Sequence, residues 1–70
     1  MSKYEKLWCY IKDGGKPQYV LTFDEIEKIA GISLDHSFLR YKKELLEYGY
    51  EVLKISMKTK TVLFIKKGNG

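Results

Sequence analysis

The sequence predicts a small α+β domain in which three short helices and one short strand precede a β-hairpin. Two observations lead to this expectation. Apolar side chains recur at helical spacing in three separate stretches before residue 49, whereas the chain after residue 49 is rich in Val, Leu and Ile and is interrupted once by a polar turn. Seventy residues suffice for one core, so we expect residues 1–70 to form a single domain.

The first helix is expected over residues 3–12. Ser2, followed three residues later by Glu5, is the pattern of a capping box at its start. Two glycines and a proline break regular structure over 13–18, so we expect a loop there and a short strand at 19–21. One face of the first helix is apolar and carries four side chains at helical spacing: Tyr4, Leu7, Trp8 and Ile11.

The centre of the chain predicts a helix over 23–30, a tight turn and a third helix over 35–48. Thr22 and Glu25 form a second capping-box pattern, and Gly31 is a natural left-handed end for the second helix. The third helix carries an apolar stripe spaced by four, three, four and three residues: Leu34, Phe38, Tyr41, Leu45 and Tyr48.

Gly49 ends the third helix, and residues 50–66 predict a β-hairpin that turns over 58–60. Helix, short strand, helix, helix and hairpin is the order of a winged helix, with the hairpin as the wing. A rival small α+β topology without a groove-reading helix has the same order of elements. In either case we expect these core side chains: Leu7, Trp8, Ile11, Leu21, Phe23, Ile26, Ile29, Leu34, Phe38, Leu45, Leu53, Ile55 and Phe64.

Charge is unevenly distributed along the chain, whose formal net charge is +4. Residues 1–35 contain five lysines and six acidic residues, a net charge of −1, whereas residues 36–70 contain eight basic and three acidic residues, a net charge of +5. A polyanion would therefore dock on the second half. The other interpretation is that the lysines only keep a small domain soluble.

We expect the third helix and the hairpin tip to bind double-stranded DNA. At about 100° per residue, the apolar stripe faces inward and a basic face points outward. Arg in the first half of such a helix can meet base edges, and nearby cations can meet phosphates. The turn before the helix departs from a strict helix-turn-helix, because Glu27 stands where that motif prefers a small residue. The predicted DNA-binding residues are His36, Ser37, Arg40, Lys43, Lys58 and Lys60.

The alternative function is a protein-binding module of the same fold, such as a small phage-encoded inhibitor or adaptor, that uses exposed Tyr and Lys side chains. We do not expect an enzyme, a metal site or a cofactor. His36 and Cys9 are the only histidine and cysteine, and Cys9, between Trp8 and Tyr10, is interpreted as a small packed thiol. No apolar run is long enough for a membrane span or a secretion signal, so a cytoplasmic location is expected.

Several stretches between residues 4 and 66 match the pattern L-T-F-x-E-I-E-x-I-x-G and two strand patterns, G-W-x-V and V-x-F. Through them the chain resembles an uncharacterised bacterial domain family of winged-helix-like fold and no assigned activity. Asp35 replaces the proline of that family, and 41–48 contains none of its tryptophans. The matching residues are Tyr4, Leu7, Tyr10, Ile11, Leu21, Thr22, Phe23, Glu25, Ile26, Glu27, Ile29, Gly31, Leu34, Ser37, Gly49, Val52, Val62 and Phe64. The resemblance implies the fold alone.

Overall fold

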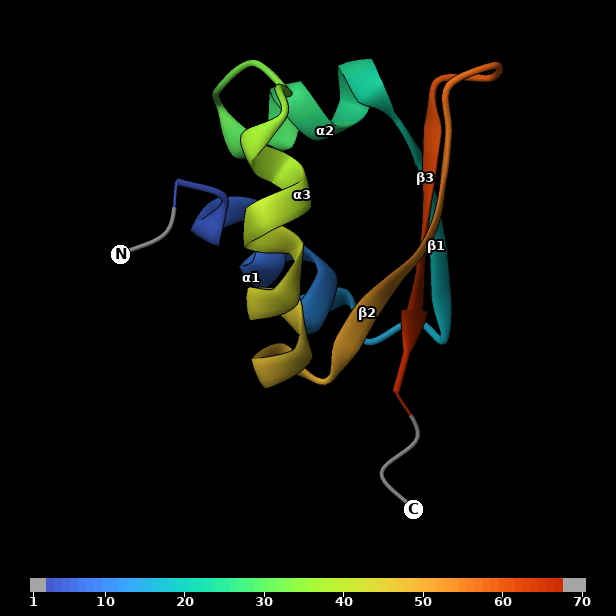
Figure 1. The fold of residues 1–70 in the computed structure, drawn as a ribbon. Coiled ribbons are helices and arrows are strands. Elements are labelled where there is room, and N and C mark those ends of the chain that lie inside the picture. The colour runs from blue at the N-terminus through green and yellow to red at the C-terminus, as the bar shows by residue number, and fades with distance from the viewer. Residues whose placement is uncertain (1–2, 68–70) are drawn as a thin grey trace.

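A computed structural model describes residues 3–67 and places the helical segments on one side of a three-stranded sheet (Figure 1). This is the small α+β fold that the sequence predicts, in an order consistent with a winged helix. The elements are α1 (Glu5–Gly14), β1 (Gln18–Thr22), α2 (Phe23–Ala30), α3 (Ser37–Tyr41), the 3-10 helix η1 (Lys42–Tyr48), β2 (Tyr50–Ser56) and β3 (Thr61–Lys66).

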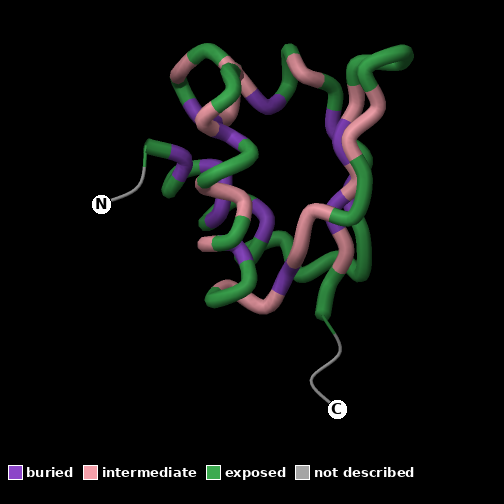
Figure 2. The backbone as a smooth tube through the Cα atoms, in the orientation of Figure 1, coloured by how far each residue is buried: buried purple, intermediate pink, exposed green. Residues whose placement is uncertain are grey.

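The sheet is antiparallel and has the order β1-β3-β2, so the last strand of the chain lies at its centre. Leu21 of β1 lies opposite Val62 of β3, and Val52 of β2 lies opposite Phe64. Side chains alternate between the two faces of a strand, and this register places the apolar ones together on the face toward the helices. Buried residues accordingly line the space between the two layers (Figure 2).

A β-bulge interrupts the pairing of β2 with β3 between Val52 and Lys54. The extra residue is Leu53, and a bulge transfers every later side chain of its strand to the opposite face. Strict alternation from Val52 would have put the Lys54 side chain against the helices; instead Lys54 is exposed and Ile55 packs against the core. Leu53 is 55% exposed, so its predicted place in the core is wrong.

Most of the predicted core is confirmed. The chain buries Leu7, Trp8, Ile11, Leu21, Ile26, Phe38, Leu45 and Phe64, and packs Phe23, Ile29, Leu34 and Ile55 partly buried against them. The predicted core omitted five buried residues: Tyr4, Tyr19, Ala30, Tyr50 and Val62.

Two of the omitted tyrosines are buried because their hydroxyl groups find backbone partners. The Tyr19 hydroxyl donates to the Ile11 carbonyl oxygen at 2.8 Å, and the Tyr50 hydroxyl donates to the Lys16 carbonyl oxygen at 2.6 Å. Burial also raises the pKa of Tyr50 above its ordinary value. Gly14 makes room for the Tyr19 ring, since a Cβ atom at this position would collide with the Tyr19 hydroxyl.

The first helix differs from its predicted bounds of 3–12, because α1 starts at Glu5 and extends to Gly14. Its N-cap residue, Tyr4, makes no side-chain capping hydrogen bond. The capping-box pattern at Ser2 falls outside the described residues. Cys9 is exposed, so its interpretation as a packed thiol is wrong: it lies outside the buried stripe of Leu7, Trp8 and Ile11 on α1.

The second helix begins with the predicted capping box. Glu25 donates its backbone N–H to Thr22 Oγ1 at 3.0 Å, and Thr22 donates its own backbone N–H to Glu25 Oε1 at 2.8 Å. The helix ends at Gly31, which adopts the left-handed conformation with φ 79°. Both ends of α2 are therefore those that its sequence predicts.

The third helix is shorter than predicted and changes type. Instead of one helix over 35–48, Ser37–Tyr41 forms an α-helix and Lys42–Tyr48 a 3-10 helix, and together they make one continuous rod, the α3–η1 rod (Figure 1). Asp35 stands outside it, because its carboxylate accepts hydrogen bonds from the backbone N–H and the hydroxyl of Ser37. Gly49 ends the rod with φ 87°, as predicted.

Substitution of Phe38 tests the packing of the rod. Phe38 is 3% exposed, and its ring centroid lies 5.3 Å from that of Tyr4 and 5.9 Å from that of Trp8. Phe38→Ala should remove roughly 3–5 kcal/mol of unfolding free energy and leave the domain largely unfolded by circular dichroism. The control is Leu46→Ala on the same rod, whose 50% exposed side chain should contribute at most about 0.5 kcal/mol. Equal melting temperatures for the two variants would contradict this packing.

The capping box can be tested by substitution of its two residues. Thr22→Ala should lower the free energy of unfolding by about 0.5–2 kcal/mol, because it leaves the Glu25 N–H without its acceptor. The combined loss of Thr22→Ala and Glu25→Ala should be smaller than the sum of the two single losses, since both side chains belong to one reciprocal pair. Denaturant unfolding of the parent, the two single variants and the double variant gives the coupling free energy between the two side chains. Fully additive losses of unfolding free energy would argue against the capping box.

Candidate nucleic-acid interface

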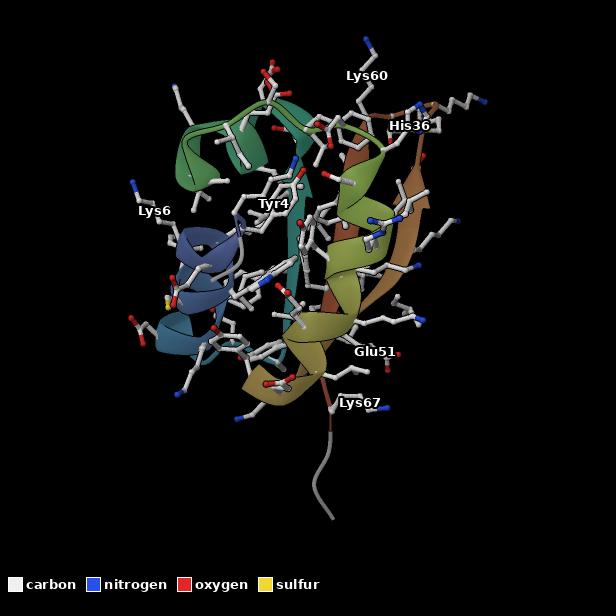
Figure 3. The ribbon with its side chains drawn as sticks, turned by 60° about the vertical axis from the view of Figure 1, so that its left-hand side comes forward. Tyr4, Lys6, His36, Glu51, Lys60 and Lys67 are labelled. Carbon is white, nitrogen blue, oxygen red and sulfur yellow. The ribbon has the colours of Figure 1, made fainter. Side chains whose placement is uncertain are left out.

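The predicted DNA-binding residues lie on the α3–η1 rod and on the turn of the hairpin. All are exposed except Ser37, which is half-buried. The N-terminal end of the rod and the hairpin tip lie at the same end of the molecule, where His36 and Lys60 are found (Figure 3). Lys43 lies farther along the rod, in η1.

The hairpin turn is held against the rest of the fold by backbone contacts. Lys60 adopts a left-handed backbone with φ 55°, and its carbonyl oxygen accepts a hydrogen bond of 2.9 Å from the N–H of Phe23. The hydroxyls of Thr59 and Thr61 lie 2.8 Å apart and share a hydrogen bond. The turn is therefore tied to the start of α2, and it presents Lys58 and Lys60 from a defined position.

Four exposed cations of this surface, which we call the site cations, are Arg40, Lys43, Lys58 and Lys60. Within residues 3–67 the ion pairs join Lys3 to Asp35 at 3.4 Å and Lys67 to Glu51 at 3.3 Å, and neither uses a site cation. Their positive charge is thus available to an outside anion.

The Ser37 hydroxyl is engaged within the fold. Its hydroxyl donates to Asp35 Oδ1, which also accepts the Ser37 backbone N–H at 2.9 Å. The Ser37 hydroxyl and then the Ser37 N–H, with a smaller effect of Lys3, hold the pKa of Asp35 below its ordinary value. An Asp two residues before a helical Ser is a common turn pattern, so the sequence carries a signal for this contact.

The structure also reveals an apolar groove of about 510 Å³ that the sequence analysis missed. It lies between α2, the start of the rod and the far half of β2. Its rim includes Leu39 and Met57, which are 51% and 74% exposed. The only sequence hint was that these large apolar residues fall outside the expected core. The lining residues are Phe23, Glu27, Leu34, Asp35, His36, Phe38, Leu39, Ile55 and Met57.

No protein-family model, curated protein or solved structure matches this chain, so the candidate site is assigned from its own geometry. Among residues 3–67, His, Cys, Asp and Glu side chains form no group of three that could hold a metal ion. In the same part of the chain, no helix combines the length and the apolar character that crossing a membrane requires.

The Asp35–Ser37 contact predicts a pH effect. Ser37→Ala should raise the pKa of Asp35 toward its ordinary value, because the hydroxyl is the largest cause of the lowering. A carboxylate whose pKa is lowered by folding stabilises the fold above its unfolded pKa of about 3.9 and loses this contribution as pH falls through the folded pKa. NMR titration of the Asp35 carboxyl carbon measures the change, and an unaltered pKa in Ser37→Ala would refute the assigned cause.

Proposed function

We propose that this domain binds double-stranded DNA with the α3–η1 rod and the hairpin tip, in the manner of a winged helix. The observation that supports the proposal is the set of exposed site cations on these two elements, none of which forms an ion pair within residues 3–67. Phosphate neutralisation by such cations supplies most of the affinity of non-specific DNA binding.

The proposed roles follow from position. Arg40 lies on the α-helical part of the rod and can meet base edges in the major groove, where Arg pairs with guanine. Lys43 is farther along the rod and is assigned to a phosphate. Lys58 and Lys60 at the hairpin tip are assigned to phosphates beside the rod, as wing residues. His36, at the N-terminal end of the rod, lies beside the base edges in this arrangement.

Salt dependence tests the proposal. If the four site cations each neutralise about one phosphate, log affinity should fall with log salt at a slope near −3.6, roughly a hundredfold loss over a fourfold rise in salt. Reversing charge with Arg40→Glu and Lys43→Glu together should abolish binding to a mixed-sequence duplex, measured by fluorescence anisotropy. The melting temperature should be nearly unchanged, because both side chains are exposed.

Lys12→Glu is the matched control. Lys12 is exposed on α1, outside the proposed surface, so its reversal should reduce affinity much less than reversal at the rod. Absence of salt-sensitive binding to duplex DNA at micromolar protein would overturn the proposal, as would an equal effect of Lys12→Glu.

A further inference from the structure

The apolar groove has the size of a binding site, and its floor belongs to the core. Its volume of about 510 Å³ lies within the range of about 300–1,000 Å³ that ligand-binding clefts occupy. Phe38 is buried, and Leu34 and Ile55 pack half-buried against the core. Because core packing holds these lining side chains, the groove is formed before any occupant arrives.

Two large apolar side chains of the groove remain exposed to solvent. Leu39 is 51% exposed and Met57 is 74% exposed, although both line the groove. Apolar side chains gathered around a concave surface mark binding sites more often than singly scattered ones do. An occupant that covers these two side chains removes apolar surface from water, so it must present apolar side chains of its own.

The carboxylates that line the groove give it a negative charge. Among the described residues, the lining includes Glu27 and Asp35 but no lysine or arginine. The whole chain has a formal net charge of +4, so the groove is an acidic site on a basic protein. Charge complementarity therefore favours a cationic occupant.

Both carboxylates are oriented by backbone N–H groups and keep their charge. Glu27 Oε2 accepts the Leu34 N–H at 2.8 Å. Asp35 Oδ1 accepts the Ser37 N–H at 2.9 Å. Such neutral donors fix the direction of a carboxylate without cancelling its charge. Within residues 3–67 no ion pair uses Glu27, and the pair of Asp35 with Lys3 joins exposed side chains at 3.4 Å, a kind of pair that contributes little. Each carboxylate can therefore accept a cation from a partner.

We propose that this groove binds a basic amphipathic helix of a partner protein. Apolar residues at i, i+3 or i+4 and i+7 of such a helix fill the groove, and Lys or Arg side chains beside this stripe meet Glu27 and Asp35. A helix suits the groove better than an extended strand does, because Ile55 and Met57 line it with side chains and a helix satisfies its own backbone hydrogen bonds. The proposal does not depend on the DNA-binding proposal.

A peptide titration tests the proposal. The probe is a synthetic peptide of about 15 residues with Leu at one helical stripe and Lys on its flanks, compared with a scrambled peptide of the same composition and with a version that has Glu in place of Lys. We expect the first peptide alone to shift the backbone amide NMR signals of Leu34, Leu39, Ile55 and Met57 in the full chain. Its affinity should fall as salt is added, because salt screens charge pairs at the surface.

Two substitutions in the groove remove charge and little else. Glu27→Gln and Asp35→Asn each keep an oxygen that can accept the same backbone N–H, so the double variant should remain folded. It should bind the basic peptide about fivefold more weakly or worse than the parent does. Glu47→Gln is the matched control: Glu47 is exposed on η1 and does not line the groove, so its substitution should leave the affinity unchanged.

The chain also supplies a matched pair of apolar variants. Leu39 and Leu46 lie on the same rod and are 51% and 50% exposed, but of these two only Leu39 lines the groove. Leu39→Ser should weaken binding of the basic peptide about tenfold or more, whereas Leu46→Ser should leave it unchanged. Met57→Ser, at a more exposed position, provides a second groove variant if Leu39→Ser lowers the melting temperature.

Failure of this proposal is distinguishable from failure of DNA binding. The Glu27→Gln, Asp35→Asn double variant keeps every cation, so it should bind duplex DNA at least as tightly as the parent does. Reversal of Arg40 and Lys43 to Glu should abolish DNA binding and leave the basic peptide bound.

Several results would overturn the proposal. The basic peptide could produce no shifts at millimolar concentration, or the scrambled or Glu-bearing peptide could bind equally well. The double charge variant could bind like the parent, or Leu39→Ser and Leu46→Ser could act alike. Shifts of the groove amides with rising protein concentration and no peptide would assign the groove to a second copy of the chain, and shifts with duplex DNA but not with the peptide would assign it to DNA.

Discussion

The packing of Phe38 against Tyr4 and Trp8 holds the α3–η1 rod on α1, and every proposed binding residue of the rod depends on it. The ring of Tyr4 lies between α1 and the rod, 5.3 Å from the Phe38 centroid and 5.8 Å from that of Tyr41 (Figure 3). Trp8 adds a directional contact, since its Nε1–H donates to Glu44 Oε1 at 3.2 Å. These contacts fix which side of the rod faces outward.

The same packing explains why the groove is open. The aromatic contacts hold the rod near α1, and Tyr50 and Phe64 are buried at the end of the sheet opposite the hairpin tip. Toward the tip, the backbone hydrogen bond between Phe23 and Lys60 joins the turn to α2. The hairpin is therefore anchored at both ends, and an open groove remains beside β2.

Sequence patterns predicted the fold where local chemistry determines the backbone. The capping box of Thr22 and Glu25 and the terminal Gly49 are examples, because caps and left-handed glycines act over a few residues. The patterns did not predict the change of the rod to a 3-10 helix at Lys42. Leu45 nevertheless faces inward and Leu46 outward, as the apolar stripe predicts, although this segment has three residues per turn.

The candidate site was also predictable only in part. Residue types and helical spacing located the site cations, but the groove depends on the bulge at Leu53, which no local pattern predicts. Because of the bulge, Ile55 and Met57 face the helices and line the groove, while Lys54 is on the exposed face. Without the extra residue, the alternation would place Lys54 toward the groove and remove Ile55 from its floor. A single inserted residue thus accounts both for the apolar lining of β2 and for a lysine outside it.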